Sequence, residues 1–374
     1  MWLYLLIGIG GIFAIGIIAS IISYVKQKMD ANPIIQSLNK EGVDFESFKE
    51  MLNKPGLLFG NPLLNYIASH GATICLIKQK DGKFRVFDFS NHENIEKFFP
   101  EKDNLKISSY TNGYRGYTDD ISLLLSHHPY NFQQQDIILF HPNMYKFFPR
   151  VFTNDNNLDK NTQRDIEKLE GLLNKKGIDA NYKVYGHSLG VRNGLRVARR
   201  LSNLHPDKQI KCTVKNVPVA TDCKTMANNV VNLLEQGNVD MDMIYTNTFY
   251  HDNQHTKDVL CEMSKIIKER SADANFRKKM ERINSGQAFN CRTNEHHTHE
   301  EATRDMQDFV NLWRREVISY IMPTARLPKS NVAKIKVRDT NVDKTCKQKT
   351  ETNNTVNIKY NLSKLDTKRE VGHR

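Results

Sequence analysis

The sequence lacks the patterns that mark several classes of protein. None of its six cysteines belongs to a C-x-x-C pair, and an even number of cysteines does not by itself make a disulfide framework. The thiols therefore fit a reducing compartment. No internal repeat is found, and no nucleic-acid-binding module accompanies the net charge of +12, so we expect no nucleic-acid partner.

Charged side chains are also missing from the segment between Trp2 and Val25, where Ile, Leu and Gly predominate. About 20 apolar residues cross a bilayer as a helix, so this run is long enough. A cleaved signal peptide has its basic residues before the apolar run, whereas Lys26 and Lys28 follow it here. We therefore expect a single-pass membrane anchor at residues 1–25, with the rest of the protein on the cytoplasmic side. The alternative is a helix buried in a partner or an oligomer.

The positive charge is concentrated at the other end of the chain. Residues 323–374 carry 13 Lys and Arg against 5 Asp and Glu, a net charge of +8, and the remaining residues carry +4. Few large apolar residues accompany this charge, which predicts a disordered basic tail over residues 322–374. Each basic residue near an anionic lipid surface contributes about 1 kcal/mol of attraction. The tail is expected either to bind such a surface or to be solvated without a partner.

Between these ends, residues 26–70 are expected to form a connector, with a short helix at Phe45–Leu52, and residues 71–321 to form the main domain. A turn at Asp81-Gly82 predicts a β-hairpin. From there apolar strands alternate with amphipathic helices, which predicts an α/β fold with a mostly parallel sheet flanked by helices. The later predicted elements include strands at Asp136–Phe140, Tyr182–Tyr185, Val214–Val219, Met243–Phe249 and Gln287–Cys291, and helices at residues 162–176, Met226–Leu234, Lys257–Ile283 and His299–Tyr320.

The most informative segment is the pentapeptide Gly186-His187-Ser188-Leu189-Gly190, a G-x-S-x-G motif that we call the serine turn. A strand-like run precedes it and an amphipathic helical run follows it. This context is typical of a strained strand-to-helix turn that presents a serine hydroxyl. Gly186 and Gly190 leave room for the strand and the helix to approach each other. Ser188 is therefore the predicted nucleophile, and it requires a base and a group that orients the base.

With this motif, residues 72–320 resemble the α/β-hydrolase superfamily, especially its lipases and esterases, and are similar to the lipase-like effectors that some intracellular bacteria secrete. The resemblance implies an acid after a strand downstream of the nucleophile and a histidine after the last strand. The acid is then Asp252, which follows the strand two positions after the serine turn. Asp222, which also ends a predicted strand, is the alternative.

For the histidine, His296, His297 and His299 cluster between the last predicted strand and the last helix. Thr298 and Glu301 match a T-x-x-E capping box, so we expect the helix to begin at Thr298. His297 then stays in the loop and is the preferred base, with His299 and His296 as alternatives.

The resemblance also implies two backbone donors for an oxyanion. One is the N–H of Leu189, the residue after the nucleophile. The other belongs to a loop after an earlier strand, where this chain has Phe140-His141-Pro142-Asn143. Because proline has no N–H, Asn143 is the expected donor.

A metal-binding interpretation competes, because His251 and His255 are four residues apart and three more histidines follow. The Glu that a zincin carries next to its first histidine is absent, so no metal or cofactor is expected. The sequence thus predicts a membrane-associated serine hydrolase that cleaves carboxylic esters, with lipid acyl esters as the expected substrate class. A catalytically inactive membrane interaction module and an acyltransferase are the alternatives.

Overall fold

A computed structural model describes the backbone of residues 2–54, 61–111, 132–141, 158–215, 222–245, 250–284, 286, 288–293 and 300–323. Within these ranges, no side chain is described for residues 2–14, 68, 189, 245, 250–253, 292–293 and 300–307. The chain divides into two compact units, residues 1–325 and 326–374, and the described residues all belong to the first.

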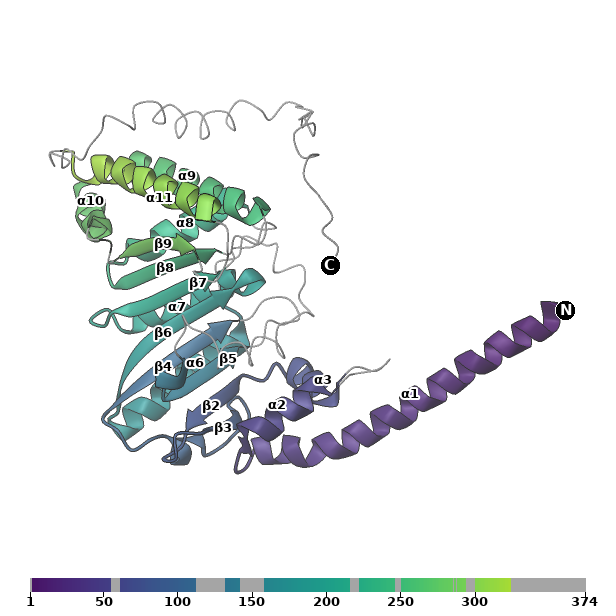
Figure 1. Ribbon diagram of the computed structural model, residues 1–374. Coiled ribbons are helices and arrows are strands. Elements are labelled where there is room, and N and C mark those ends of the chain that lie inside the picture. Colours follow the sequence, from purple (N-terminus) through teal and green to yellow (C-terminus); the bar gives the residue numbers. More distant parts are fainter. Residues whose placement is uncertain are drawn as a thin grey trace, which may run out of the picture. The chain divides into compact units, whose positions relative to one another are not determined.

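The first unit is built around a nine-stranded sheet with the order β1-β3-β2-β5-β4-β6-β7-β8-β9 (Figure 1). Its strands are β1 (Val43–Asp44), β2 (Ile74–Lys78), β3 (Phe84–Asp88), β4 (Asn104–Thr111), β5 (Ile137–His141), β6 (Asp179–His187), β7 (Ile210–Lys215), β8 (Val239–Tyr245) and β9 (Phe289–Thr293). β2 is antiparallel to both of its neighbours, β3 and β5, and β1 is antiparallel to β3. The strands from β5 to β9 are all parallel, so the expected mostly parallel sheet is confirmed.

Helices flank this sheet. They are α1 (Trp2–Leu38), α2 (Phe45–Asn53), α3 (Pro62–His70), α6 (Lys160–Lys176), α7 (Val191–Leu204), α8 (Cys223–Leu234), α9 (Tyr250–Arg270), α10 (Ala274–Met280) and α11 (Glu300–Ile321). α7 packs on β4, β6 and β7, whereas α8 packs on β8 and α9, and α11 packs on β9 and α9. The expected helix at 162–176 is confirmed as α6, which ends at Gly177 in the left-handed conformation (φ 65°).

Several of the expected boundaries are wrong, among them those of the strand expected at Val214–Val219, which lies further toward the N-terminus as β7. The helix expected at Lys257–Ile283 begins earlier, at Tyr250, and is divided into α9 and α10, because the side chain of Asp273 caps α10 by accepting from the N–H of Asn275. The strand expected at Met243–Phe249 lies further toward the N-terminus, as β8. Strand β4 was not predicted at all.

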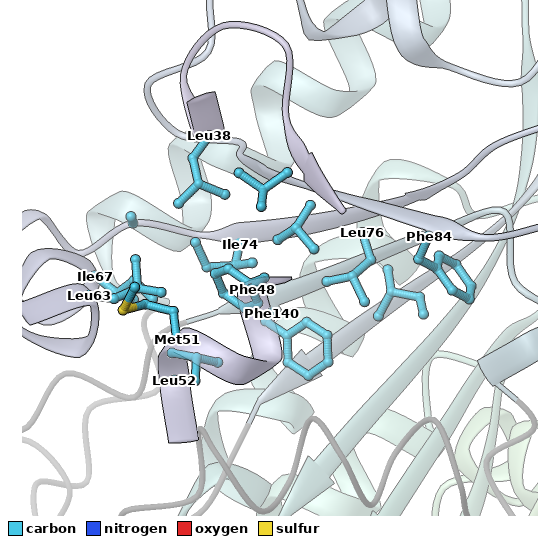
Figure 2. Close-up of a cluster of buried hydrophobic side chains, with 14 of the residues drawn as sticks. Leu38, Phe48, Met51, Leu52, Leu63, Ile67, Ile74, Leu76, Phe84 and Phe140 are labelled. Atoms are coloured by element: carbon cyan, nitrogen blue, oxygen red, sulfur yellow. The ribbon is translucent and has the colours of Figure 1, made fainter. Parts of the chain in front are cut away.

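The described residues between 26 and 70, where we expected a connector, pack against the hairpin β2–β3. Apolar side chains of α1, α2 and α3 join those of β2 and β5 in one buried cluster (Figure 2). The buried Asn61 links two of these helices: its amide donates to Met51 O (2.8 Å) and Lys54 O (2.9 Å), and its oxygen accepts from Leu63 N (2.9 Å) at the start of α3. The predicted short helix in this segment is confirmed as α2.

The expected membrane anchor falls within α1, a continuous helix from Trp2 to Leu38. Over the part of the chain that the structure describes, no helix has both the length and the apolar character needed to cross a bilayer. The transmembrane helix expected at residues 1–25 is thus not found there, and the side chains of residues 1–14 lie outside that part. Further along α1, the isoleucine side chains of Ile15, Ile18 and Ile22 are exposed.

Candidate active site

Ser188 has an unusual backbone conformation. β6 ends at His187, a 3-10 turn covers Ser188–Gly190, and α7 begins at Val191. Ser188 has a φ of 50°, and among the described residues it is the one non-glycine residue with positive φ. This conformation costs a residue with a side chain roughly 1–2 kcal/mol, and it persists only where the surrounding structure enforces it. The predicted strained turn between strand and helix is therefore confirmed.

Close packing between β6 and α7 enforces this conformation. A Cβ atom built on Gly186 would lie 2.8 Å from the Cα of Val191 and 3.2 Å from Gly190 O. A Cβ atom on Gly194, one turn into α7, would lie 3.1 Å from the Cα of Gly186. Any side chain at either glycine would push the helix away from the strand. The motif predicted the role of Gly186, whereas Gly194 lies outside the motif and was missed.

A hydroxyl group from the neighbouring strand joins the two sides of the turn. Thr111, the last residue of β4, is buried and pairs in register with Gly186. Its Oγ1 lies 2.7 Å from Gly190 O and 3.2 Å from Tyr185 O. A hydroxyl has one hydrogen to donate, so the shorter contact, to Gly190 O, is the stronger one. Thr111 thus connects the residue before α7 with the strand that precedes Ser188.

The two expected oxyanion donors follow different strands of the sheet, Leu189 after β6 and Asn143 after β5. Leu189 lies in the 3-10 turn directly before α7, where the first N–H groups of a helix have no partner within the helix and carry its positive dipole end. Asn143 lies outside the described residues. It follows β5, and β4 separates β5 from β6 in the sheet.

His141, which ends β5, is not available to a substrate. Its imidazole is buried, with Nε2 3.3 Å from Ser109 Oγ and Nδ1 3.4 Å from Thr73 Oγ1. Burial lowers the pKa of this histidine, and the carboxylate of Asp165 opposes the shift. His141 therefore belongs to a buried polar network with Ser109 and Thr73 at the carboxyl end of β5.

The two candidate acids lie at the beginnings of two different helices, α9 and α8. Asp252 lies in the first turn of α9 rather than in a loop, and its side chain is outside the described part. Asp222 is exposed and caps α8, because its Oδ2 accepts from the N–H of Thr225 (2.8 Å). This backbone hydrogen bond lowers the pKa of Asp222. The alternative acid thus already has a structural role.

The three candidate bases lie in the segment that connects β9 with α11. β9 ends at Thr293 and α11 begins at Glu300. His296, His297, His299 and the expected cap Thr298 are outside the described residues, so their roles stay predictions.

The competing metal site gains no support from the described residues. His255 is buried in α9, and its Nδ1 lies 3.5 Å from Cys223 Sγ, while the side chain of His251 is not described. Within the described ranges, no group of three or more His, Cys, Asp and Glu side chains could hold a metal ion.

Comparison with known proteins yields little. No protein-family model matches the chain, and no curated protein matches it either. Among solved structures, the chain is similar to poly(aspartic acid) hydrolase-1 from Sphingomonas sp. KT-1, with 15% sequence identity and a TM-score of 0.32. That similarity covers 57% of this chain and 89% of the other. A TM-score this low does not establish a common fold.

Proposed function

We propose that this protein is a serine hydrolase of the α/β-hydrolase type and that Ser188 attacks the carbonyl carbon of a carboxylic ester. The strained backbone of Ser188, enforced by Gly186, Gly194 and Thr111, is the observation that carries the proposal. Strain of this kind is concentrated at functional sites, and at a strand-to-helix turn it presents the side chain for reaction.

The order of the strands supports the proposed partners of Ser188. β6, β8 and β9 are parallel, so their carboxyl ends lie at one edge of the sheet. Ser188 follows β6, Asp252 follows β8, and the segment with His297 follows β9, the last strand. These are the places at which the superfamily carries its nucleophile, acid and histidine.

In the proposed mechanism, His297 accepts the proton of Ser188 as the hydroxyl oxygen attacks, and Asp252 orients the imidazole. The N–H groups of Leu189 and Asn143 stabilise the negative oxygen of the tetrahedral intermediate. As the intermediate collapses, His297 gives that proton to the departing oxygen, so the alcohol leaves and an acyl-enzyme remains, which water then hydrolyses with His297 as the base. Because β4 lies next to β6, an N–H group of the residues that follow Thr111 is the alternative to that of Asn143 as the second oxyanion donor.

The proposed substrate class is lipid acyl esters, and the proposed location is the cytoplasmic surface of a membrane. The exposed isoleucines of α1 and the net charge of +8 over residues 323–374 support an apolar and an electrostatic contribution to membrane binding.

A fluorophosphonate probe and a short-chain p-nitrophenyl ester test the reaction class together. We expect the probe to label the full-length protein and the ester to be hydrolysed, and both activities to be lost in Ser188→Ala with the circular dichroism spectrum unchanged. Ser69→Ala, which removes an exposed hydroxyl at the end of α3, is the matched control and should change neither activity. A wild-type protein that neither takes the probe nor turns over the ester would instead be an inactive module.

A further inference from the structure

A cysteine and a histidine from two different helices, α8 and α9, lie in contact. Cys223 is the first residue of α8, and its Sγ lies 3.5 Å from Nδ1 of His255 in α9. This is within hydrogen-bonding distance for sulfur. His255 is 6% exposed, so its ring is held in place by packing, whereas Cys223 is only partly buried.

The other free thiols in the described part of the chain have different surroundings. Cys75, Cys212 and Cys291 are buried in strands of the sheet. Burial raises the pKa of the Cys212 and Cys291 thiols to about 12 and also raises that of Cys75. These three thiols are protonated and inaccessible, so they are expected to be inert.

Cys223 combines two features that accompany reactive thiols in proteins, the first position of a helix and a nearby imidazole. The positive end of the α8 dipole stabilises a thiolate at the first helical residue, and a neighbouring imidazole can take the proton. Two charged side chains flank Cys223 in sequence: Lys224 is exposed, and the carboxylate of Asp222 is directed to Thr225 N. On α9, Asp258 interacts with Gln254 Nε2 (3.0 Å). A nucleophile with a base at hydrogen-bonding distance is the arrangement that activates thiols in proteins.

We propose that Cys223 and His255 form a thiol–imidazole pair and that Cys223 is a site at which small electrophiles modify this protein. His255 Nδ1 accepts the thiol proton, and the sulfur forms a bond to the electrophilic carbon as the leaving group departs with the electrons of its own bond. With iodoacetamide as the probe, the products are the carbamidomethyl thioether, iodide and a protonated imidazole. The proposal does not depend on the reaction proposed for Ser188.

The test is the rate of alkylation of each cysteine in the folded full-length protein at pH 7, measured by peptide mass spectrometry. We expect iodoacetamide to modify Cys223 at least about tenfold faster than Cys75, Cys212 and Cys291. In His255→Asn, which keeps a hydrogen-bonding group but no base, the rate at Cys223 should fall at least about threefold. The matched control His70→Asn, at an exposed position in α3, should leave all rates unchanged.

Two results would overturn the proposal: modification of Cys223 no faster than that of the three buried cysteines, or an unchanged rate at Cys223 in folded His255→Asn. If that variant unfolds, which alkylation of the buried cysteines would reveal, a synthetic peptide with the sequence of residues 219–228 replaces it as the reference. Cys223 in the folded wild type must then react faster than the same cysteine in the peptide, and an equal or slower rate refutes the pair.

Discussion

Replacing Thr111 with valine removes one hydroxyl group from the contact between β4 and the serine turn while the side chain keeps its shape. The hydroxyl donates to Gly190 O at 2.7 Å, and Thr111 is 1% exposed, so no water can replace it. Loss of a buried hydrogen bond that leaves its acceptor unsatisfied costs about 1–3 kcal/mol. The left-handed conformation of Ser188 costs roughly 1–2 kcal/mol. The two terms are of similar size, so the turn should relax when the hydroxyl is lost.

We therefore expect Thr111→Val to lower the free energy of unfolding by about 1–3 kcal/mol in a urea titration. It should also slow the reaction of the fluorophosphonate probe with Ser188 by about tenfold, because a loss of about 1.4 kcal/mol in the positioning of the nucleophile corresponds to that factor. Thr111→Ser restores the hydroxyl and should recover most of the labelling rate.

A variant elsewhere in the sheet separates this effect from general destabilisation. Thr213→Val removes a hydroxyl at a partly buried position in β7. Among the described residues, this hydroxyl makes no hydrogen bond to the serine turn. The variant should leave the labelling rate unchanged. The reasoning would be refuted if folded Thr111→Val reacted as fast as the wild type.

Two further predictions concern stability. Gly194→Ala should lower the free energy of unfolding in urea by about 1–3 kcal/mol, because its Cβ would lie 3.1 Å from the backbone of Gly186. Gly171→Ala in α6 is the control: its Cβ would meet nothing within 4 Å, so this variant should be neutral or stabilised by up to about 1 kcal/mol. Burial lowers the pKa of His141, so the unfolded chain binds the proton more readily than the folded protein. The free energy of unfolding should therefore decline as the pH falls below about 6.5, by at most about 1.4 kcal/mol per pH unit. His141→Gln should reduce this slope in urea titrations at different pH values.

The parts of the fold that were predicted from sequence depend on local signals. The β2–β3 hairpin follows from Asp81-Gly82, since Gly82 has the positive φ (82°) that such a turn requires. The serine turn follows from two glycines and a serine within five residues. In both cases the residues that determine the conformation are neighbours in the chain, so their pattern is visible in the sequence.

The contacts that were missed depend on the order of strands in space. β4 carries two consecutive serines, Ser108 and Ser109, that are buried in spite of their polarity, so its sequence does not look like a core strand. Its position between β5 and β6 is not given by chain order. Without β4 there was no reason to select Thr111, which bonds to a carbonyl 79 residues away.

The packing of the described residues between 26 and 70 was not predicted, for the same reason. Phe48 and Leu63 are ordinary apolar residues of short helices, and they are buried in a cluster that also includes residues of α1, the hairpin and β5. For the candidate site, the local part of the prediction, the turn at Ser188, is confirmed. The assignments of Asp252 and His297 rest on resemblance and on the order of the strands, and they stay predictions.

The most direct measurement is the location of the fluorophosphonate adduct by peptide mass spectrometry after brief labelling of the folded wild-type protein. A single adduct on Ser188, absent when His297→Ala is treated in the same way, is the result that the proposed mechanism predicts. Labelling at other serines with Ser188 unmodified would contradict the claim that the strained turn presents a nucleophile.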